Sequence, residues 1–506
     1  MTGISRALVL MTAACLTASG AAEAASDAQR IAALEAQLNQ QRAVMEQQQR
    51  MLEAMDAELQ RLKAGSEQAA VDGTSPAPAV AAVTPARPGG DSPTASGPAE
   101  AAAEPARTAA ASPGASRKPS GLSVDVYGFV QADAIYDFKR VDPNWEDTLR
   151  VTTIPTQGGA FGNDGETVFS VRQSRLGIKG NYGEDITFKL EGELFGVGSD
   201  QGQTTFRLRH AWATYKNFGM GQTWSNWMDI DIFPNTIDYW GPTGMVFYRN
   251  QQARYTFPLG DDVFSVSLED PSTALTVGQF RDTSTCDLSN PAPDCESVDS
   301  TAAEVYQSYN NLPDLTARYR QNGDFGHFQL AGIVRKLGYE RIDNRDNLVK
   351  DHEVGWGINT SAGLRTWGED MLKLQVAYGH GIGNYMNDGG VDIAPDNADI
   401  DLASAEALPT LGLSAYYDHF WNEKWASSIG WSMTDLDTSD GQAGTEFKQG
   451  QIATVNLLHY PADHVMLGTE FTWGQREDID GNLGSDYRIQ FSLKVDFDSG
   501  DLMRRR

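Results

Sequence analysis

Apolar and polar side chains alternate from about Ser123 to Phe497, in segments of about ten residues. Successive side chains of a β-strand point to opposite faces of a sheet, so each segment has one apolar and one polar face. The last segment shows this clearly. Its apolar face carries Tyr487, Ile489, Phe491, Leu493, Val495 and Phe497, and its polar face carries Arg488, Gln490, Ser492, Lys494 and Asp496.

Connectors between the segments alternate between short turns and longer loops, and the segments recur about sixteen times. This arrangement is typical of an antiparallel barrel that spans a membrane, with short turns at one edge and long loops at the other. We therefore predict an all-β transmembrane barrel over residues 122–497, with about 16 antiparallel strands. The short loop at 197–203 and the ambiguous alternation over 218–228 leave 14 and 18 strands open.

The remaining chain divides into four parts. Residues 1–24 combine a basic start, an apolar stretch and small residues, which predicts a secretory signal peptide. Residues 26–63 carry an apolar heptad, which predicts an α-helical coiled coil. Residues 64–121 are rich in Ala, Pro, Gly, Ser and Thr, which predicts a disordered linker. Residues 498–506 form a C-terminal extension beyond the last strand.

A coiled coil joined to a barrel favours a homotrimer, in which the helices lie in the periplasm and the barrel lies in the outer membrane of a Gram-negative bacterium. Gln41 and Gln48 interrupt the apolar seam, as polar residues that fix register and oligomeric state often do. The alternative is a solitary amphipathic helix that lies on another surface.

The formal net charge is -28, from 68 acidic and 40 basic residues, which disfavours binding of nucleic acid through a general basic surface. The polar faces of the segments have the opposite balance, because basic residues outnumber acidic ones there. The basic set is Arg175, Lys179, Lys189, Arg207, Arg209, Arg254, Arg318, Arg320, Arg335, Lys373, Arg488 and Lys494. The acidic set is Asp125, Asp133, Glu191, Glu193, Glu269, Asp418, Glu470 and Asp496.

A barrel of this size encloses an aqueous channel unless something fills it, so these inward residues carry the function. Arg207 with Arg209, and Arg318 with Arg320, place two guanidinium groups on one inner face. Guanidinium groups bind carboxylate or phosphate with two hydrogen bonds, which predicts a channel that prefers small anions. The alternative is that these arginines pair with acidic residues of the interior and only brace the wall.

The long connector at about 228–248 is rich in aromatic residues and less acidic than the other loops. We predict that it folds into the barrel as a constriction loop, with Asp229, Asp231, Tyr239 and Trp240 at the constriction. A plain external loop is the alternative.

The acidic excess lies mainly in the loops at 271–312 and 384–407, and the second of these holds six acids and no base. A solvated surface is the expected explanation. The alternative is that divalent cations bridge these loops to anionic headgroups, with outer-membrane lipids and lipopolysaccharide as the expected surroundings.

Cys286 and Cys295 remain as a pair after the signal peptide, which contains Cys15, is removed. Export to an oxidising compartment predicts a disulfide between them that closes a small loop. We expect neither a metal site nor a cofactor. We also expect no enzyme, because no histidine is accompanied by a nucleophile motif.

Several stretches resemble the DcaP-like trimeric outer-membrane porins. These are YGFVQADAIYDF (127–138), RVDPNWEDTLRVTTIP (140–155), VRQSRLGIKG (171–180), GQTWSNWMDIDIFPNTIDYWGPTG (221–244) and RNQQARYTF (249–257). The order of coiled coil, linker and barrel resembles this family as well.

The resemblance implies a homotrimeric barrel of sixteen strands that takes up small anionic solutes such as dicarboxylates. It implies Arg175, Arg249 and Arg254 as pore-lining positions, whereas Arg172 falls on the outward alternation and is left out. One departure is that residues 498–506 follow Phe497, whereas barrels of the outer membrane usually end on the aromatic residue.

We therefore expect a porin for passive diffusion, with a pore lined by Arg175, Arg207, Arg209, Arg249, Arg254, Arg318, Arg320 and Arg335. The alternative function is a structural tether of the envelope, in which the coiled coil reaches peptidoglycan or another periplasmic partner.

Overall fold

The computed structural model describes residues 121–278, 306–342, 348–398 and 404–499. The predicted signal peptide, coiled coil and linker therefore lie outside the described residues, as do Cys286, Cys295 and all but the first two residues of the C-terminal extension. The alternating region that was predicted to form the barrel is described almost throughout.

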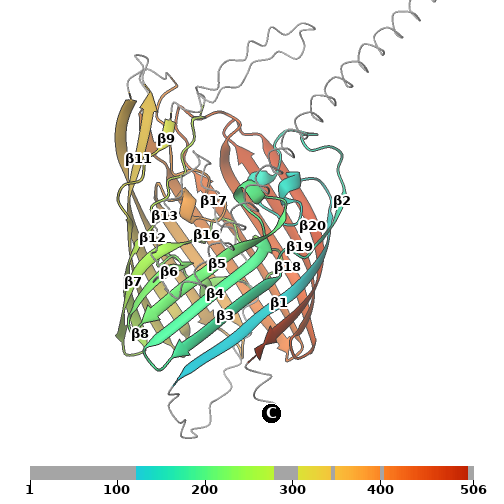
Figure 1. Cartoon of the computed structure of the whole chain (residues 1–506). Helices are drawn as coiled ribbons and strands as arrows, with labels where there is room; N and C mark the ends of the chain where they lie inside the picture. The colour runs from blue at the N-terminus through green and yellow to red at the C-terminus, as the bar shows by residue number, and fades with distance from the viewer. Residues whose placement is uncertain (1–120, 279–305, 343–347, 399–403, 500–506) are drawn as a thin grey trace, which may run out of the picture. The chain divides into compact units, whose positions relative to one another are not determined.

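Sixteen antiparallel strands form one closed wall, which confirms the predicted strand number and excludes 14 and 18 (Figure 1). The wall closes because β1 pairs with β20, from Tyr127 opposite Asp498 to Asp137 opposite Arg488. The strands are β1 (Leu122–Asp137), β3 (Arg175–Tyr182), β4 (Ile186–Phe195), β5 (Thr204–Tyr215), β6 (Phe218–Trp224), β7 (Arg249–Leu259), β8 (Asp262–Glu269), β10 (Asp314–Gly323), β11 (Gly326–Ile342), β12 (Leu348–Arg365), β13 (Met371–His380), β16 (Pro409–Asn422), β17 (Trp425–Leu436), β18 (Phe447–Ala462), β19 (Val465–Asp478) and β20 (Leu483–Asp498).

Two short strands continue the wall where a longer strand is interrupted. β2 (Glu166–Ser170) pairs with the upper part of β1, and β3 pairs with the lower part of the same strand. In the same way, β9 (Tyr306–Ser308) and β10 both pair with β11, each along a different part of it. The sheet therefore contains eighteen strands at sixteen positions of the wall.

Alternation along the strands sorts side chains between the two faces of the wall, as the sequence predicts. In β20, Phe491, Leu493 and Val495 are exposed on the outer face, whereas Gln490 and Lys494 are buried inside. An exposed apolar surface around the whole barrel suits hydrocarbon, in which a closed sheet leaves no edge without a hydrogen-bonding partner.

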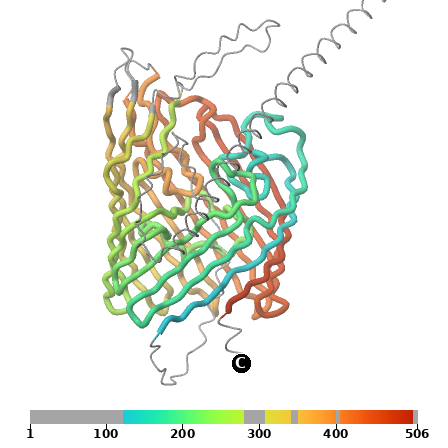
Figure 2. Tube along the Cα trace, in the orientation of Figure 1, coloured from blue at the N-terminus to red at the C-terminus, as the bar shows by residue number. Residues whose placement is uncertain are grey.

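The wall is not equally high on all sides. β6 has 7 residues and β8 has 8, whereas β11 has 17 and β12 has 18. In Figures 1 and 2 the green strands from β4 to β8 accordingly end below the tops of β11 and β17. One side of the barrel is therefore a low wall.

Short turns join the strands at the end where β1 begins and β20 ends, and the long connections lie at the opposite end (Figures 1 and 2). These connections hold a hairpin of β14 (Ile393–Pro395) and β15 (Ala405–Ala407). Among the described residues no helix is both long and apolar enough to cross a membrane. The described helices are the 3-10 turns η1 (Pro143–Trp145), η2 (Val151–Thr153), η3 (Gly198–Asp200), η4 (Ile230–Ile232) and η6 (Gly383–Tyr385).

The apolar outer face yields a first prediction, at Ile429 on β17. Ile429 is 58% exposed and lies four residues from Trp425 along the same outer face. Ile429→Arg should lower the free energy of unfolding in lipid by about 2–4 kcal/mol, because a charge near the bilayer midplane loses its hydration. The same substitution at Trp425, nearer the membrane surface, should cost about 0–1 kcal/mol. Urea unfolding in vesicles measures both, and equal costs would contradict the assigned outer face.

Candidate functional site

The connector between β6 and β7, residues 225–248, folds into the interior of the barrel, as predicted for a constriction loop. Inward-facing side chains of the opposite wall hold its backbone. Asn359 of β12 donates a hydrogen bond to the Trp227 carbonyl at 2.9 Å. Lys373 of β13 donates to the Phe233 carbonyl at 2.5 Å. These contacts exclude a plain external loop.

Glu470 of β19 anchors the far tip of the loop. Its carboxylate accepts hydrogen bonds from the backbone N–H of Ile237 at 2.8 Å and of Asp238 at 2.9 Å. Asn456 of β18 donates to the same carboxylate at 2.9 Å and to the Asn235 carbonyl at 2.7 Å. The tip is thereby tied to strands near the C-terminal end of the barrel.

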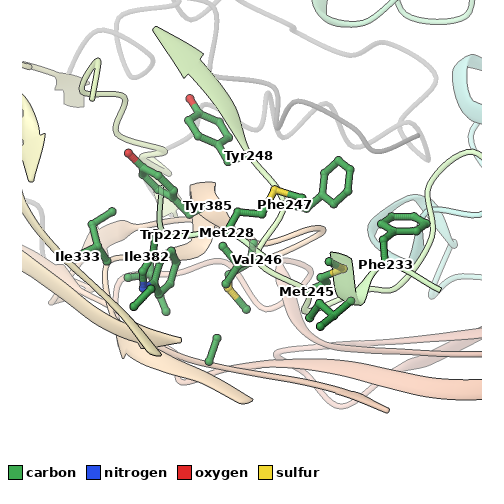
Figure 3. Close-up of a cluster of buried hydrophobic side chains, with 14 residues drawn as sticks. Trp227, Met228, Phe233, Met245, Val246, Phe247, Tyr248, Ile333, Ile382 and Tyr385 are labelled. Carbon is green, nitrogen blue, oxygen red and sulfur yellow. The ribbon is translucent and has the colours of Figure 1, made fainter. Parts of the chain in front are cut away.

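The loop also packs against the connection between β13 and β16, and Figure 3 shows the buried apolar cluster that results. Phe247 N–H donates to the Tyr385 carbonyl at 2.9 Å, and Asn387 N–H donates to the Met245 carbonyl at 2.8 Å. The interior at this level is therefore filled with ordered protein. The labelled side chains are Trp227, Met228, Phe233, Met245, Val246, Phe247, Tyr248, Ile333, Ile382 and Tyr385.

The predicted constriction residues have different surroundings. Tyr239 and Trp240 are fully buried, and Tyr239 stacks on Phe195 with ring centroids 3.5 Å apart. The hydroxyl of Tyr239 donates to Glu193 at 2.6 Å. Tyr239 and Trp240 therefore attach the loop to the wall, and their buried rings do not border open space.

Asp229 is buried in the loop, whereas the side chain of Asp231 is 56% exposed. Asp229 contacts His327 at 2.8 Å, Ser361 at 2.7 Å and Arg320 at 3.2 Å. Burial raises the pKa of Asp229, but His327, Arg320 and the hydrogen bond from Ser361 outweigh it and leave the pKa below its usual value. Arg320 of β10 also pairs with Asp231 at 2.6 Å, so its ion pairs hold the start of the loop against the wall.

Four of the predicted arginines gather around two glutamates of β4. Arg209 lies 2.8 Å from Glu191 and 2.6 Å from Glu193, and Arg207 pairs with Glu193. Arg175 lies 3.7 Å from both glutamates, and Arg249 lies 3.8 Å from Glu193. These arginines brace the wall, which was the alternative to anion binding, although four cations against two anions leave the group positive.

Arg335 is likewise held by acidic residues, with Asp314 at 2.9 Å and Asp392 at 2.9 Å. Its guanidinium also donates to the Gly381 carbonyl at 2.6 Å. Because it is fully buried, Arg335 joins β11 to the connection after β13 and is closed to a passing solute.

Arg254 of β7 and Arg318 of β10 differ from the other six predicted arginines. Within the described residues no carboxylate forms an ion pair with either one, and both are only half-buried. Arg254 donates to the side-chain carbonyl of Gln252 at 3.0 Å, and Arg318 donates to the hydroxyl of Ser265 at 3.1 Å. They lie on either side of β8, opposite Ser267 and Ser265 respectively.

A cavity of about 1860 Å³ opens at the short-turn end of the barrel. Residues 235–238 of the loop line it, together with the turns at 422–424 and 461–464. Its lining holds five basic residues, among them Arg175 and Lys189, and eight acidic residues. The loop thus bounds a wide vestibule on the side where β1 begins and β20 ends.

Two expectations about charged residues were wrong. Asp388 and Asp392, assigned to a solvated acidic loop, are buried and pair with Arg150 at 3.0 Å and Arg335 at 2.9 Å. Arg172, assigned to the outer face, is buried and pairs with Asp147 at 2.7 Å. The alternation fails at Arg172 because residues 171–174 interrupt the wall between β2 and β3.

In the described part of the chain no group of His, Cys, Asp and Glu side chains is arranged to hold a metal ion.

Residues 113–269 match the family model described as DcaP outer membrane protein, which confirms the resemblance found in the motifs. The structure is similar to the crystal structure of the outer membrane channel DcaP of Acinetobacter baumannii, with 23% identity and a TM-score of 0.60, over 76% of this chain and 99% of that chain. It is also similar to an anion-selective porin from Comamonas acidovorans, with 11% identity and a TM-score of 0.46, over 74% of this chain and all of that one. No curated protein matches the sequence. The first likeness shows that the chain has the fold of an outer-membrane channel.

The two classes of arginine predict different effects on stability. Arg209→Gln should lower the free energy of unfolding by about 3–5 kcal/mol, because it leaves buried Glu191 and Glu193 with less compensating charge. Arg254→Gln should cost far less, since no ion pair is broken. Urea unfolding in detergent measures both variants, and similar losses would contradict the division into bracing and unpaired arginines.

The anchor of the loop tip gives a further prediction. Glu470→Gln replaces one accepting oxygen with an amide that cannot accept from the N–H groups of Ile237 and Asp238. We expect faster hydrogen exchange in peptides covering 235–238, measured by mass spectrometry. Glu423→Gln, in a short turn, is the matched control and should leave that exchange unchanged. Unaltered exchange in Glu470→Gln would show that the other contacts suffice.

Proposed function

We propose that this chain is a homotrimeric outer-membrane porin for passive diffusion of small, preferably anionic solutes such as dicarboxylates. The fold of an outer-membrane channel, the apolar outer face and the loop inside the barrel support a channel. The anion selectivity of the Comamonas acidovorans porin belongs to that protein, and the likeness to it is too low to transfer this property. The preference for anions has to come from the residues of this chain.

Arg254 and Arg318 are the observation that carries the preference for anions. Both guanidinium groups are held by neutral partners and lie two strand positions apart on the inner face. A guanidinium without a carboxylate partner keeps N–H donors and a full charge for a solute. Two such groups, one on each side of β8, suit a solute with two carboxylates, and their partial exposure suits binding weak enough for release.

The bracing arginines have a supporting role. Arg175, Arg207, Arg209 and Arg249 surround Glu191 and Glu193 with a positive excess, which adds a favourable field for anions along this wall. Arg207 and Arg209 donate hydrogen bonds to these glutamates, and Arg207 also donates to Tyr239, so these two arginines contribute charge and hold the wall.

The oligomeric state and the contacts with other components of the envelope remain predictions. The trimer rests on the coiled coil predicted for residues 26–63, and contacts with lipopolysaccharide and peptidoglycan rest on the proposed location. The tether function depends wholly on residues before the barrel, so deletion of 26–120 is the experiment that would separate it from transport.

The test of anion preference is the reversal potential of the purified full chain in a planar bilayer under a gradient of potassium chloride. We expect an anion-selective potential that shifts toward zero in the double variant Arg254→Gln and Arg318→Gln. Loss of one unit charge at about 4 Å changes the energy of an ion by about 1 kcal/mol in water, which is about fivefold in population. Because the double variant loses two charges, the chloride-to-potassium permeability ratio should fall by at least about fivefold.

Arg365→Gln is the control, because Arg365 is an exposed arginine at the end of β12 near the short turns. It should retain the selectivity of the unchanged protein. Cation selectivity in the unchanged protein would contradict the proposal, and so would an unchanged potential in the double variant. Absence of any conductance from a folded trimer would favour the tether.

A further inference from the structure

We propose that the wall of this barrel holds a resident chloride ion, bound within a buried group of arginines that we call the arginine cluster. The arginine cluster consists of Arg175 of β3, Glu191 and Glu193 of β4, Arg207 and Arg209 of β5, and Arg249 of β7. The ion is a structural component of the folded protein, whereas the solutes of the proposed function pass Arg254 and Arg318. The inference therefore does not rest on transport.

The arginine cluster carries an excess of positive charge. Its four guanidinium groups pair with two carboxylates, and guanidinium groups stay protonated in proteins. Lys189 adds another cation, 3.3 Å from Glu191. The cluster therefore has two positive charges in excess, before Lys189 is counted.

This excess charge is removed from water. The side chains of Arg209, Arg249 and both glutamates are at most 2% exposed, and that of Arg175 is 7% exposed. Burial of a charge costs folding free energy unless an opposite charge compensates it, and two carboxylates compensate only half of the four cations. A bound anion supplies the negative charge that these side chains lack.

Two of the guanidinium groups also have buried nitrogens that lack a hydrogen-bond acceptor. These are Nε of Arg175 and Nη1 of Arg207, which no atom of the described residues accepts from. Arg175 reaches both glutamates only at 3.7 Å, which is too long for a hydrogen bond. Because buried donors are almost always satisfied, these nitrogens point to an acceptor other than the described side chains.

The strand register brings the two donors together. Arg175 and Arg207 both lie directly opposite Glu193, one on each side of β4, and both pair with its carboxylate. The side chains of directly opposite residues start about 4.5–5.5 Å apart. Arg249 lies 3.8 Å from the same carboxylate. The nitrogens without an acceptor therefore belong to one site around Glu193.

An anion accounts for the donors and the charge together. A water molecule would accept the hydrogen bonds but leave the excess charge unchanged. Chloride is spherical and accepts hydrogen bonds from any direction, which suits donors that come from two strands. One chloride compensates one of the two excess charges, so this wall still attracts anions.

The site can be reached from the vestibule. Arg175, Lys189 and Glu191 line the cavity of about 1860 Å³ at the short-turn end of the barrel. Acidic residues outnumber basic ones in the lining as a whole, so the arginine cluster is the part of this surface where an anion gathers. An ion from the vestibule therefore meets the cluster at Arg175.

Bromide is the direct probe, because it replaces chloride and scatters X-rays anomalously. Crystals of the full chain soaked in sodium bromide should show an anomalous peak within the cluster, at hydrogen-bonding distance from Arg175 or Arg207. Absence of a peak there would overturn the proposal. Peaks of equal height at exposed arginines such as Arg365 would mean an adventitious ion only, and would overturn it as well.

Unfolding by urea in detergent tests the structural role of the ion. Chloride is varied at fixed ionic strength with gluconate as the replacing anion, so that screening stays constant. A ligand that binds only the folded protein stabilises it in proportion to its concentration above the dissociation constant. A tenfold rise in chloride should then change the unfolding equilibrium constant about tenfold. A constant that does not respond to chloride would contradict a resident ion.

Variants at Arg175 show where the chloride acts. Arg175→Gln removes one excess charge and one set of donors, and should abolish most of the chloride dependence. Arg175→Lys keeps the charge without the planar donors, so the dependence should begin at a higher chloride concentration, and this variant decides the matter if Arg175→Gln does not fold. Arg365→Gln is the control and should respond to chloride as the unchanged protein does. Equal behaviour of the variants at 175 and 365 would overturn the proposal.

These outcomes are separable from the proposed function. The double variant Arg254→Gln and Arg318→Gln should keep the chloride dependence of unfolding, because it leaves the arginine cluster intact. Loss of the dependence in that variant would assign the stabilising anion to Arg254 and Arg318 and overturn the resident site. Loss of the dependence in Arg175→Gln, with anion-selective conductance retained, would confirm that the chloride is structural.

Discussion

In the hydrocarbon of a membrane there is no water to bond the backbone N–H and C=O groups, so all of them must be paired within the protein. This structure depends on that constraint. β1 and β20 pair over their length, so the sheet closes and neither strand presents an edge. Closure in turn divides the side chains into an outer set that is apolar and an inner set that is polar. The interior is then wide enough to admit the long connections, which fill part of it with ordered protein.

The interior shows how buried charge is managed when many basic residues face inward. Most arginines are neutralised by carboxylates on neighbouring strands, as Arg209 is by Glu191 and Glu193. A buried pair of this kind adds little net stability, but removal of one partner is costly, so such pairs fix geometry. Arg254 and Arg318 have neutral partners and keep their charge available. The interior therefore holds two classes of arginine, those paired with carboxylates and those hydrogen-bonded to neutral groups.

The sequence was sufficient for the strands, because alternation with a period of two is a local signal that tertiary packing rarely overrides. It also predicted that the connector at about 228–248 enters the barrel. It could not predict where Asp388 and Asp392 lie, since their partners, Arg150 and Arg335, are distant in the chain. Arg172 shows a second limit, because an interrupted strand resets the alternation. The division of the arginines was hidden for a similar reason: both interpretations place the same residues on the inner face.

The anchoring of the loop tip has a consequence for the order of assembly. Residues 235–238 are held by Glu470 of β19, Asn456 of β18 and Gln490 of β20, which are the last strands to be synthesised. The loop itself belongs to the first half of the barrel. Its final position is therefore unavailable until the C-terminal strands have joined β1. The loop inside the barrel is therefore fixed only after the wall has closed, so the interior takes its final form last.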